Sequence, residues 1–163
     1  MKQEINDSDF DIYVKAASLG AVAGLRAMTA PALLSYFASR GKNNRLKNNL
    51  LASPKISVVC ALLAAGELVG DKLPFTPNRM ELPGLTARIV SGAFVGGSIC
   101  AARKKSVWTG AVVGAVSAVA AAYAGQNIRR IISEESGVPS AAIGAVEDAI
   151  AIGVGINALK NNE

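Results

Sequence analysis

The sequence predicts an all-α, multi-pass membrane protein of about five hydrophobic helices, one of which can be a re-entrant segment. Residues 106–128 form 23 consecutive residues without a charge, which is long enough to cross a bilayer as a helix. Hydrophobic residues make up 51% of the chain before its 16 glycines are added, whereas soluble domains reach about 45–50% with glycine included. The excess consists mainly of small residues, which let helices approach closely in lipid.

The amino-terminal part, residues 1–13, is polar and precedes a single helical membrane domain over residues 14–160. We expect this segment to be either a short surface helix or a frayed tail. Its acidic residues outnumber its lysines, which is the reverse of a signal peptide. The first hydrophobic helix is therefore expected to be retained.

The first span is expected over residues 14–39. Small residues at spacings of three and four, among them Gly20 and Gly24, form a ridge against which a neighbouring helix can pack. Pro31 should kink this helix, and Arg26 interrupts its apolar run. A basic loop with five cations and no acid follows and extends to residue 55.

The second span is expected over residues 56–73, where Glu67 interrupts the apolar run. Three prolines between residues 70 and 84 then indicate an ordered connector that cannot be helical throughout. The third span, residues 86–102, has 17 residues. At a rise of about 1.5 Å per residue this is the lower limit for crossing, so the third span is the candidate re-entrant segment.

The fourth span is the uncharged run, with Trp108 at its start, where an aromatic ring suits the membrane interface. A short Gly- and Pro-containing turn separates it from the fifth span, residues 140–159. Two adjacent acids, Glu147 and Asp148, interrupt this last apolar run.

The distribution of Lys and Arg predicts the orientation, because loops rich in these residues stay in the cytoplasm. The two acid-free basic clusters are the first loop and residues 103–105, and five spans would place both on one side. This arrangement predicts an amino end outside and a carboxyl end in the cytoplasm.

The charges inside the apolar runs need partners, because a charge at mid-bilayer costs about 2.5–3.5 kcal/mol. One interpretation is a static ion pair that fixes helix register, with Arg26 bound to Glu67 or Glu147. The other is a hydrophilic translocation path at mid-depth. Adjacent helical residues diverge by about 100°, and we expect Glu147 rather than its neighbour to face the partner. The interior set is Arg26, Thr29, Glu67, Asp71, Glu147 and Asp148, with Asp71 better suited to the headgroup region.

A second set of cations lies around the proline-rich connector. Lys72, Arg79 and Arg88 could bind a lipid headgroup or an anionic solute, since arginine offers a planar fork to phosphate. The alternative is that these side chains reach the interface and pair with Glu81.

Several function classes find no support in the sequence. The chain has no His and only two cysteines, both in apolar runs, so no metal site, cofactor site or disulfide framework is expected. No nucleophile with a neighbouring base and no phosphate-binding loop is visible, which argues against an enzyme. No basic face with interleaved aromatic residues is present, so nucleic acid is not an expected partner.

Three runs carry a resemblance to a known family: GAVAGLRAMTAPALLSY, AAGELVGDKLPFTPNRMELPGLTARIVSGAFVGG and VPSAAIGAVEDAIAIGVG. They resemble the bacterial membrane family called domain of unknown function 4126, over nearly the whole chain from about residue 19 to residue 155. The resemblance implies a small helical protein of the bacterial inner membrane and implies no activity.

The leading functional hypothesis is translocation of a small solute or ion, in a version that can be proton-linked, through a polar interior. Arg26 would orient an acid, and Glu67 and Glu147 would bind or relay a cation or proton. The alternative is a membrane scaffold that binds lipid or a partner, with purely structural ion pairs inside. Glycine-rich helix faces also suggest homo-oligomer formation.

Overall fold

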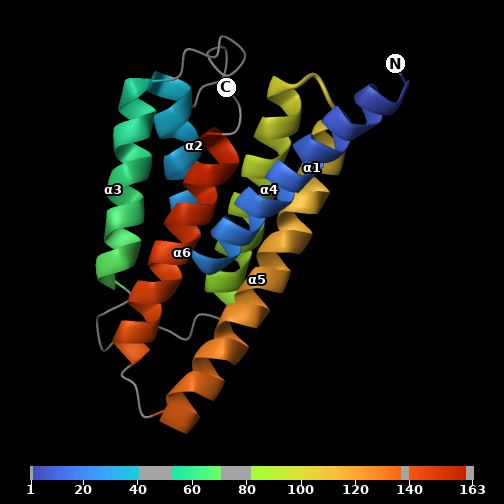
Figure 1. Cartoon of the computed structure of the whole chain (residues 1–163). Helices are drawn as coiled ribbons and strands as arrows, with labels where there is room; N and C mark the ends of the chain where they lie inside the picture. Colours follow the sequence, from blue (N-terminus) through green and yellow to red (C-terminus); the bar gives the residue numbers. More distant parts are fainter. Residues whose placement is uncertain (1, 41–52, 71–81, 137–139, 161–163) are drawn as a thin grey trace.

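The computed structural model describes residues 2–40, 53–70, 82–136 and 140–160 (Figure 1). These residues form helices and no strands, which confirms the all-α prediction. The helices are α1 (Lys2–Leu25), α2 (Thr29–Arg40), α3 (Pro54–Gly70), α4 (Leu82–Ala102), α5 (Val107–Ser136) and α6 (Ser140–Lys160).

Three of the described helices are long and apolar enough to cross a membrane. They contain the stretches Pro83–Ala102, Val107–Glu134 and Ala142–Leu159. The third apolar segment is therefore a continuous helix of 21 residues in α4, which has the length of a full crossing. A re-entrant segment does exist, but it lies elsewhere in the chain.

The first apolar segment is broken rather than continuous. The helix ends at Leu25 and starts again at Thr29. Three residues between them, called the break below, are non-helical and comprise Arg26, Ala27 and Met28. The polar segment before residue 14 is the first half of α1 and not a separate element.

The two halves of this segment run in opposite directions. Gly20 and Gly24 of α1 approach Gly114 and Ala118 of α5, so these two helices are parallel. On the other side, Arg26 binds Asp148 while Leu33 lies against Gly155. Helices α2 and α6 therefore also run in parallel.

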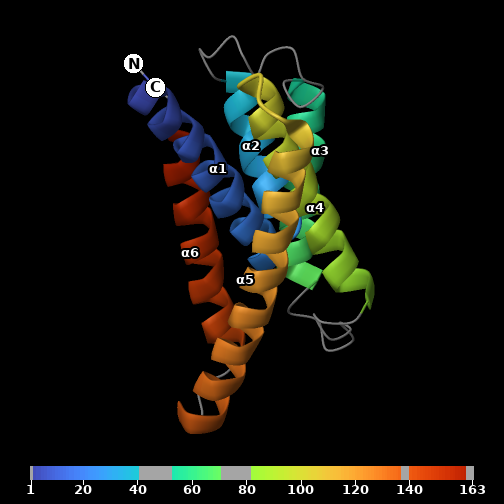
Figure 2. The same ribbon diagram turned by 90° about the vertical axis from the view of Figure 1, so that its right-hand side faces the viewer.

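Because α5 and α6 are antiparallel, α1 and α2 must be antiparallel as well. Figures 1 and 2 both show α1 descending to the break and α2 rising again to the end of the bundle at which α1 began. We call the α1–α2 pair the re-entrant pair, because it enters and leaves the bundle at the same end. The expectation of a single span over residues 14–39 was wrong.

Pro31 does not cause the change of direction. It lies in the first turn of α2, where a proline's missing N–H costs little because the first N–H groups of a helix have no partner within it. The turn is made at the break, at Arg26 to Met28.

The reversal changes the relation between the two chain ends. Figures 1 and 2 show the start of α1 and the end of α6 at the same end of the bundle, together with the α4–α5 turn. This arrangement differs from the expected one, with chain ends on opposite sides, because the first apolar segment turns back toward the end of the bundle from which it came.

Close packing between α1, α4 and α5 depends on glycine. A Cβ on Gly92 would lie 2.6 Å from the carbonyl oxygen of Gly114, and a Cβ on Gly24 would lie 2.9 Å from the Cα of Ala118. Real side chains do not tolerate such distances. The glycine ridges expected to support oligomers are therefore used for packing within this chain.

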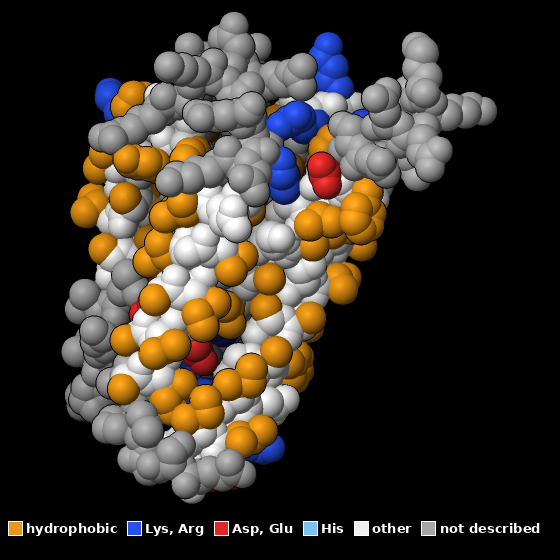
Figure 3. All heavy atoms as spheres, viewed as in Figure 1, with side chains coloured by type: hydrophobic (Ala, Val, Ile, Leu, Met, Phe, Trp, Pro, Cys, Tyr) orange, Lys and Arg blue, Asp and Glu red, His pale blue; other side chains and the backbone are white. Residues whose placement is uncertain are grey.

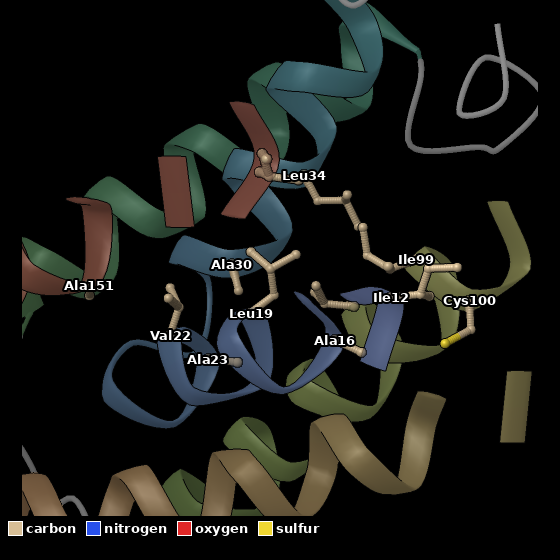
Figure 4. Packing of buried hydrophobic residues seen from close by; sticks show 12 residues of the cluster. Ile12, Ala16, Leu19, Val22, Ala23, Ala30, Leu34, Ile99, Cys100 and Ala151 are labelled. Atoms are coloured by element: carbon tan, nitrogen blue, oxygen red, sulfur yellow. The ribbon is translucent and has the colours of Figure 1, made fainter. Parts of the chain in front are cut away.

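The buried apolar core lies among α1, α2, α4 and α6 (Figure 4). Its largest fully buried side chains include Leu19, Leu34 and Val95. Many large apolar side chains on the outside are exposed, and Trp108 reaches 83%. Figure 3 shows apolar side chains spread over the length of the bundle and basic side chains gathered near its upper end. This surface has the apolar character that lipid covers.

Candidate functional site

Six ionisable side chains from five parts of the chain form a group inside the bundle. We call this group the charge cluster. Its three cations and three acids balance in formal charge, and two of the arginines are almost fully buried, with exposures of 4% for Arg26 and 7% for Arg88. The members are Arg26 of the break, Glu67 of α3, Arg88 of α4, Arg129 of α5, and Glu147 and Asp148 of α6.

The cluster lies closer to one end of the bundle than to the other. Arg88 is six residues from the start of α4, which is about 9 Å along the axis. The break reaches this level from the opposite end. Figure 3 shows acidic and basic atoms set back among apolar side chains in the lower half of the bundle.

Arg26 forms an ion pair with Asp148 through its Nε atom. The backbone N–H of Arg26 still donates to the carbonyl of Val22 at 2.8 Å, so this residue closes the last turn of α1. Its side chain then reaches across to α6. The acid of α6 that pairs with Arg26 is thus Asp148, next to the residue that the sequence favoured, Glu147.

Glu147 pairs with Arg129 on α5. The guanidinium passes over Gly144, where a Cβ would lie 3.3 Å from Nη2. The absence of a side chain at Gly144 therefore leaves space for the ion pair. The adjacent acids of α6 thus serve two different arginines, as their divergence around the helix axis requires.

Glu67 has a different role, since its carboxylate binds backbone atoms at the break. Its Oε1 accepts from the N–H of Ala27 at 2.9 Å, and its Oε2 accepts from the N–H of Met28 at 2.8 Å. These N–H groups lie at the amino end of α2, where donors have no helical partner and the helix dipole favours negative charge.

A backbone carbonyl group of the break also has a hydrogen-bond partner. The hydroxyl of Ser91 on α4 donates to the carbonyl oxygen of Ala27. Non-helical backbone at membrane depth is tolerated only where it is buried in protein or lines a cavity. The side chains of α3 and α4 meet this requirement at the break.

Arg88 lies buried inside the cluster. Its guanidinium interacts electrostatically with Glu67 and Glu147, and with the other two arginines of the cluster. This buried environment differs from the exposed one in which contact with a lipid headgroup or an anionic solute was expected. Asp71, Lys72 and Arg79, the other residues expected near that connector, lie outside the described residues.

Thr29 is buried at the first position of α2, immediately after the break. The structure thus brings together Arg26, Thr29, Glu67, Glu147 and Asp148, all of them expected site residues. Sequence reasoning missed Arg129 and Ser91. Arg129 directly follows the uncharged run, and only the continuation of α5 to Ser136 shows that it stays beside α6.

The charge cluster places side chains of both signs next to one another. Within the described ranges no three Cys, Asp or Glu side chains are grouped as ligands for a metal ion. Each acid of α6 is paired with an arginine. A pathway through this point would present both signs of charge to a solute.

Comparison with known proteins gives one match. The family described as Domain of unknown function (DUF4126) matches residues 14–161. No curated protein and no solved structure is detectably similar to the chain. The match covers most of the chain, including the second half of α1, all of α2 and every member of the charge cluster, so this protein belongs to the DUF4126 family.

Proposed function

We propose that this protein is a small integral membrane protein that moves a small solute or ion across a bilayer by way of the charge cluster. The observation that carries the proposal is the meeting of the cluster with the break of a re-entrant helix pair. Broken helices at membrane depth are typical of transport proteins, in which freed backbone groups and helix ends contact the transported solute.

The residues of the charge cluster would have different roles in transport. Arg26 would orient Asp148 through their ion pair, because arginine keeps its charge in proteins. Glu67, bound to backbone N–H groups, is the acid that can exchange these donors for water or for a solute. A carboxylate is also a usual carrier of a proton in transport proteins, so proton-linked movement is the first version to test.

The location follows from the same features. Three helices have the length and composition of membrane spans, and lipid contact would cover the exposed apolar surface. Since both chain ends lie at the end bearing the basic α4–α5 turn, we propose that both ends face the cytoplasm of a bacterial inner membrane.

The test uses purified protein in liposomes. Proton, sodium, potassium, chloride and acetate fluxes would be measured for the parent and for Glu67→Gln, Glu147→Gln and Asp148→Asn. We expect flux of at least one probe above protein-free liposomes. Each variant should lose about tenfold or more, the factor that follows from about 1.4 kcal/mol of lost stabilisation.

The matched control is Glu134→Gln, which removes an exposed acid from the far end of α5. This variant should retain the parent flux. Absence of flux of every probe in the parent, or full flux in all three folded cluster variants, would contradict the proposal.

One observation favours the alternative, a lipid- or partner-binding scaffold. The charges of the cluster balance, and both acids of α6 already pair with arginines, as in a purely structural network. Under this alternative the same substitutions would lower stability and no probe would cross. The liposome experiment therefore separates the two functions.

A further inference from the structure

Only one side of helix α3 packs against another described helix. Among the described helices, the backbone of α3 comes close only to that of α2. Figure 1 shows α3 at the edge of the bundle. From Pro54 to Glu67 no residue of α3 is fully buried, and Val58, Val59, Leu62 and Leu63 are all more than half exposed.

The inward side of α3 is a narrow stripe. Ile56, Cys60, Ala64 and Glu67 recur at spacings of three and four and are all partly buried. Three of these are small or medium-sized apolar residues, so they bury little area against α2. Segments with few buried apolar contacts open at low free energy.

Glu67 supplies the strongest contact that α3 makes. Its two hydrogen bonds to the break involve a charged acceptor and two donors at a helix amino end, and such bonds are about twice as strong as neutral ones. They also tie α3 to the break, where Arg26 and Ser91 form their own contacts with other helices. Among the described contacts of α3, loss of these two bonds would leave the apolar stripe.

We propose that α3 is a gate helix and that the Glu67 carboxylate is the latch that holds it closed over the break. In the closed state the carboxylate occupies the N–H groups of Ala27 and Met28. In the open state α3 moves outward, and those groups become accessible together with the neighbouring charge cluster. The gate is inferred from the packing of α3 and from the hydrogen bonds of Glu67, and it needs no assumption about a cargo.

The two native cysteines of the chain can be used to measure this motion. Cys60 is a free thiol on the inward stripe, and Cys100 is a free thiol buried in the core. Alkylation by N-ethylmaleimide in detergent solution, followed by mass spectrometry, reports both sites in one sample. Opening of α3 should expose Cys60 and leave Cys100 protected.

Two substitutions weaken the latch in different ways. Glu67→Gln keeps the size but removes the charge, and Glu67→Asp keeps the charge but shortens the reach. Both should speed alkylation of Cys60 by about tenfold or more, because each impairs hydrogen bonds to a charged group. Glu134→Gln should leave both thiols at the parent rate.

Hydrogen exchange of the parent adds a measurement that needs no variant. Amides of α3 should exchange well before those of α5, while the bundle of α1, α4 and α5 stays protected. An unchanged Cys60 rate in both folded variants, an equal rise at Cys100, or α3 amides as protected as those of α5 would overturn the latch. None of these readouts depends on flux, so the gate and the transport proposal can fail separately.

Discussion

Arg26 and Asp148, which are 122 residues apart in the sequence, form an ion pair that joins the helix break to α6. Their side chains are 5% and 16% exposed. The surface pair of Lys105 and Asp9, whose atoms lie 2.6 Å apart, is about one-third exposed on both sides. The chain therefore contains a buried and an exposed ion pair that can be compared directly.

We expect Asp148→Asn to lower the free energy of unfolding by about 3–5 kcal/mol, because it removes the negative charge that pairs with a buried guanidinium. Asp9→Asn, at the exposed pair, should cost at most about 1 kcal/mol. Denaturant titration in detergent micelles measures both values.

A double variant tests whether the cost comes from the stranded charge. Arg26→Met combined with Asp148→Leu should recover much of the loss, because apolar residues of similar volume often replace a buried pair without penalty. Equal losses for Asp148→Asn and Asp9→Asn would show that the buried pair does not stabilise the break.

The existence of the charge cluster could be predicted from the sequence, but its pairing could not. Charges inside apolar runs must find partners, and on that ground Arg26, Glu67 and the acids of α6 were expected to meet. Which acid meets which arginine depends on how each helix is rotated about its axis. Glu147 and Asp148 point about 100° apart, and only the packing of α5 against α6 decides between them.

The break could not be predicted from the sequence, for a related reason. The sequence of residues 14–39 is typical of one long helix that contains a proline. A kink was therefore expected at Pro31. The turn forms at Arg26 to Met28 because the carboxylate of Glu67 and the hydroxyl of Ser91 satisfy its backbone groups. Both partners lie on other helices, so local propensity carries no sign of them.

Glycine at position 114 should be needed for the contact of α5 with α4. A Cβ there would lie 2.9 Å from the carbonyl carbon of Gly92 and 3.2 Å from the Cα of Gly96. We expect Gly114→Ala to destabilise the protein by about 1–3 kcal/mol, the usual cost of overpacking. Denaturant titration again gives the value.

Gly153 is the matched control, because no atom lies within 4 Å of where its Cβ would be. Gly153→Ala should be neutral or stabilise α6 by up to about 1 kcal/mol, since alanine favours a helix. The two substitutions are chemically identical, and of the two only Gly114→Ala should lower the free energy of unfolding. A stabilising effect at Gly114 would contradict the close packing of α4 and α5.

Pro31→Ala should leave the break unchanged. Pro31 lies in the first turn of α2, where it forms no obstacle to the helix, and the reversal of direction depends on Glu67 and Ser91. We expect a change of less than about 1 kcal/mol in the free energy of unfolding.

Ser91→Ala removes the donor to the carbonyl of Ala27. This substitution should lower the free energy of unfolding by about 1–3 kcal/mol. If Pro31→Ala lowered the free energy of unfolding more than Ser91→Ala, the proline would be the cause of the turn.

The re-entrant pair predicts that both chain ends lie on one side of the membrane. Fusion of a reporter that fluoresces only in the cytoplasm, first to the amino end and then to the carboxyl end, should give signal from both positions. A reporter active only outside the cytoplasm should be silent at both. The basic residues Arg103 to Lys105 lie at the same end of the bundle and favour the cytoplasm. Signal from opposite sides would require α1 and α2 to continue in one direction, which the parallel contacts of α1 with α5 and of α2 with α6 do not allow.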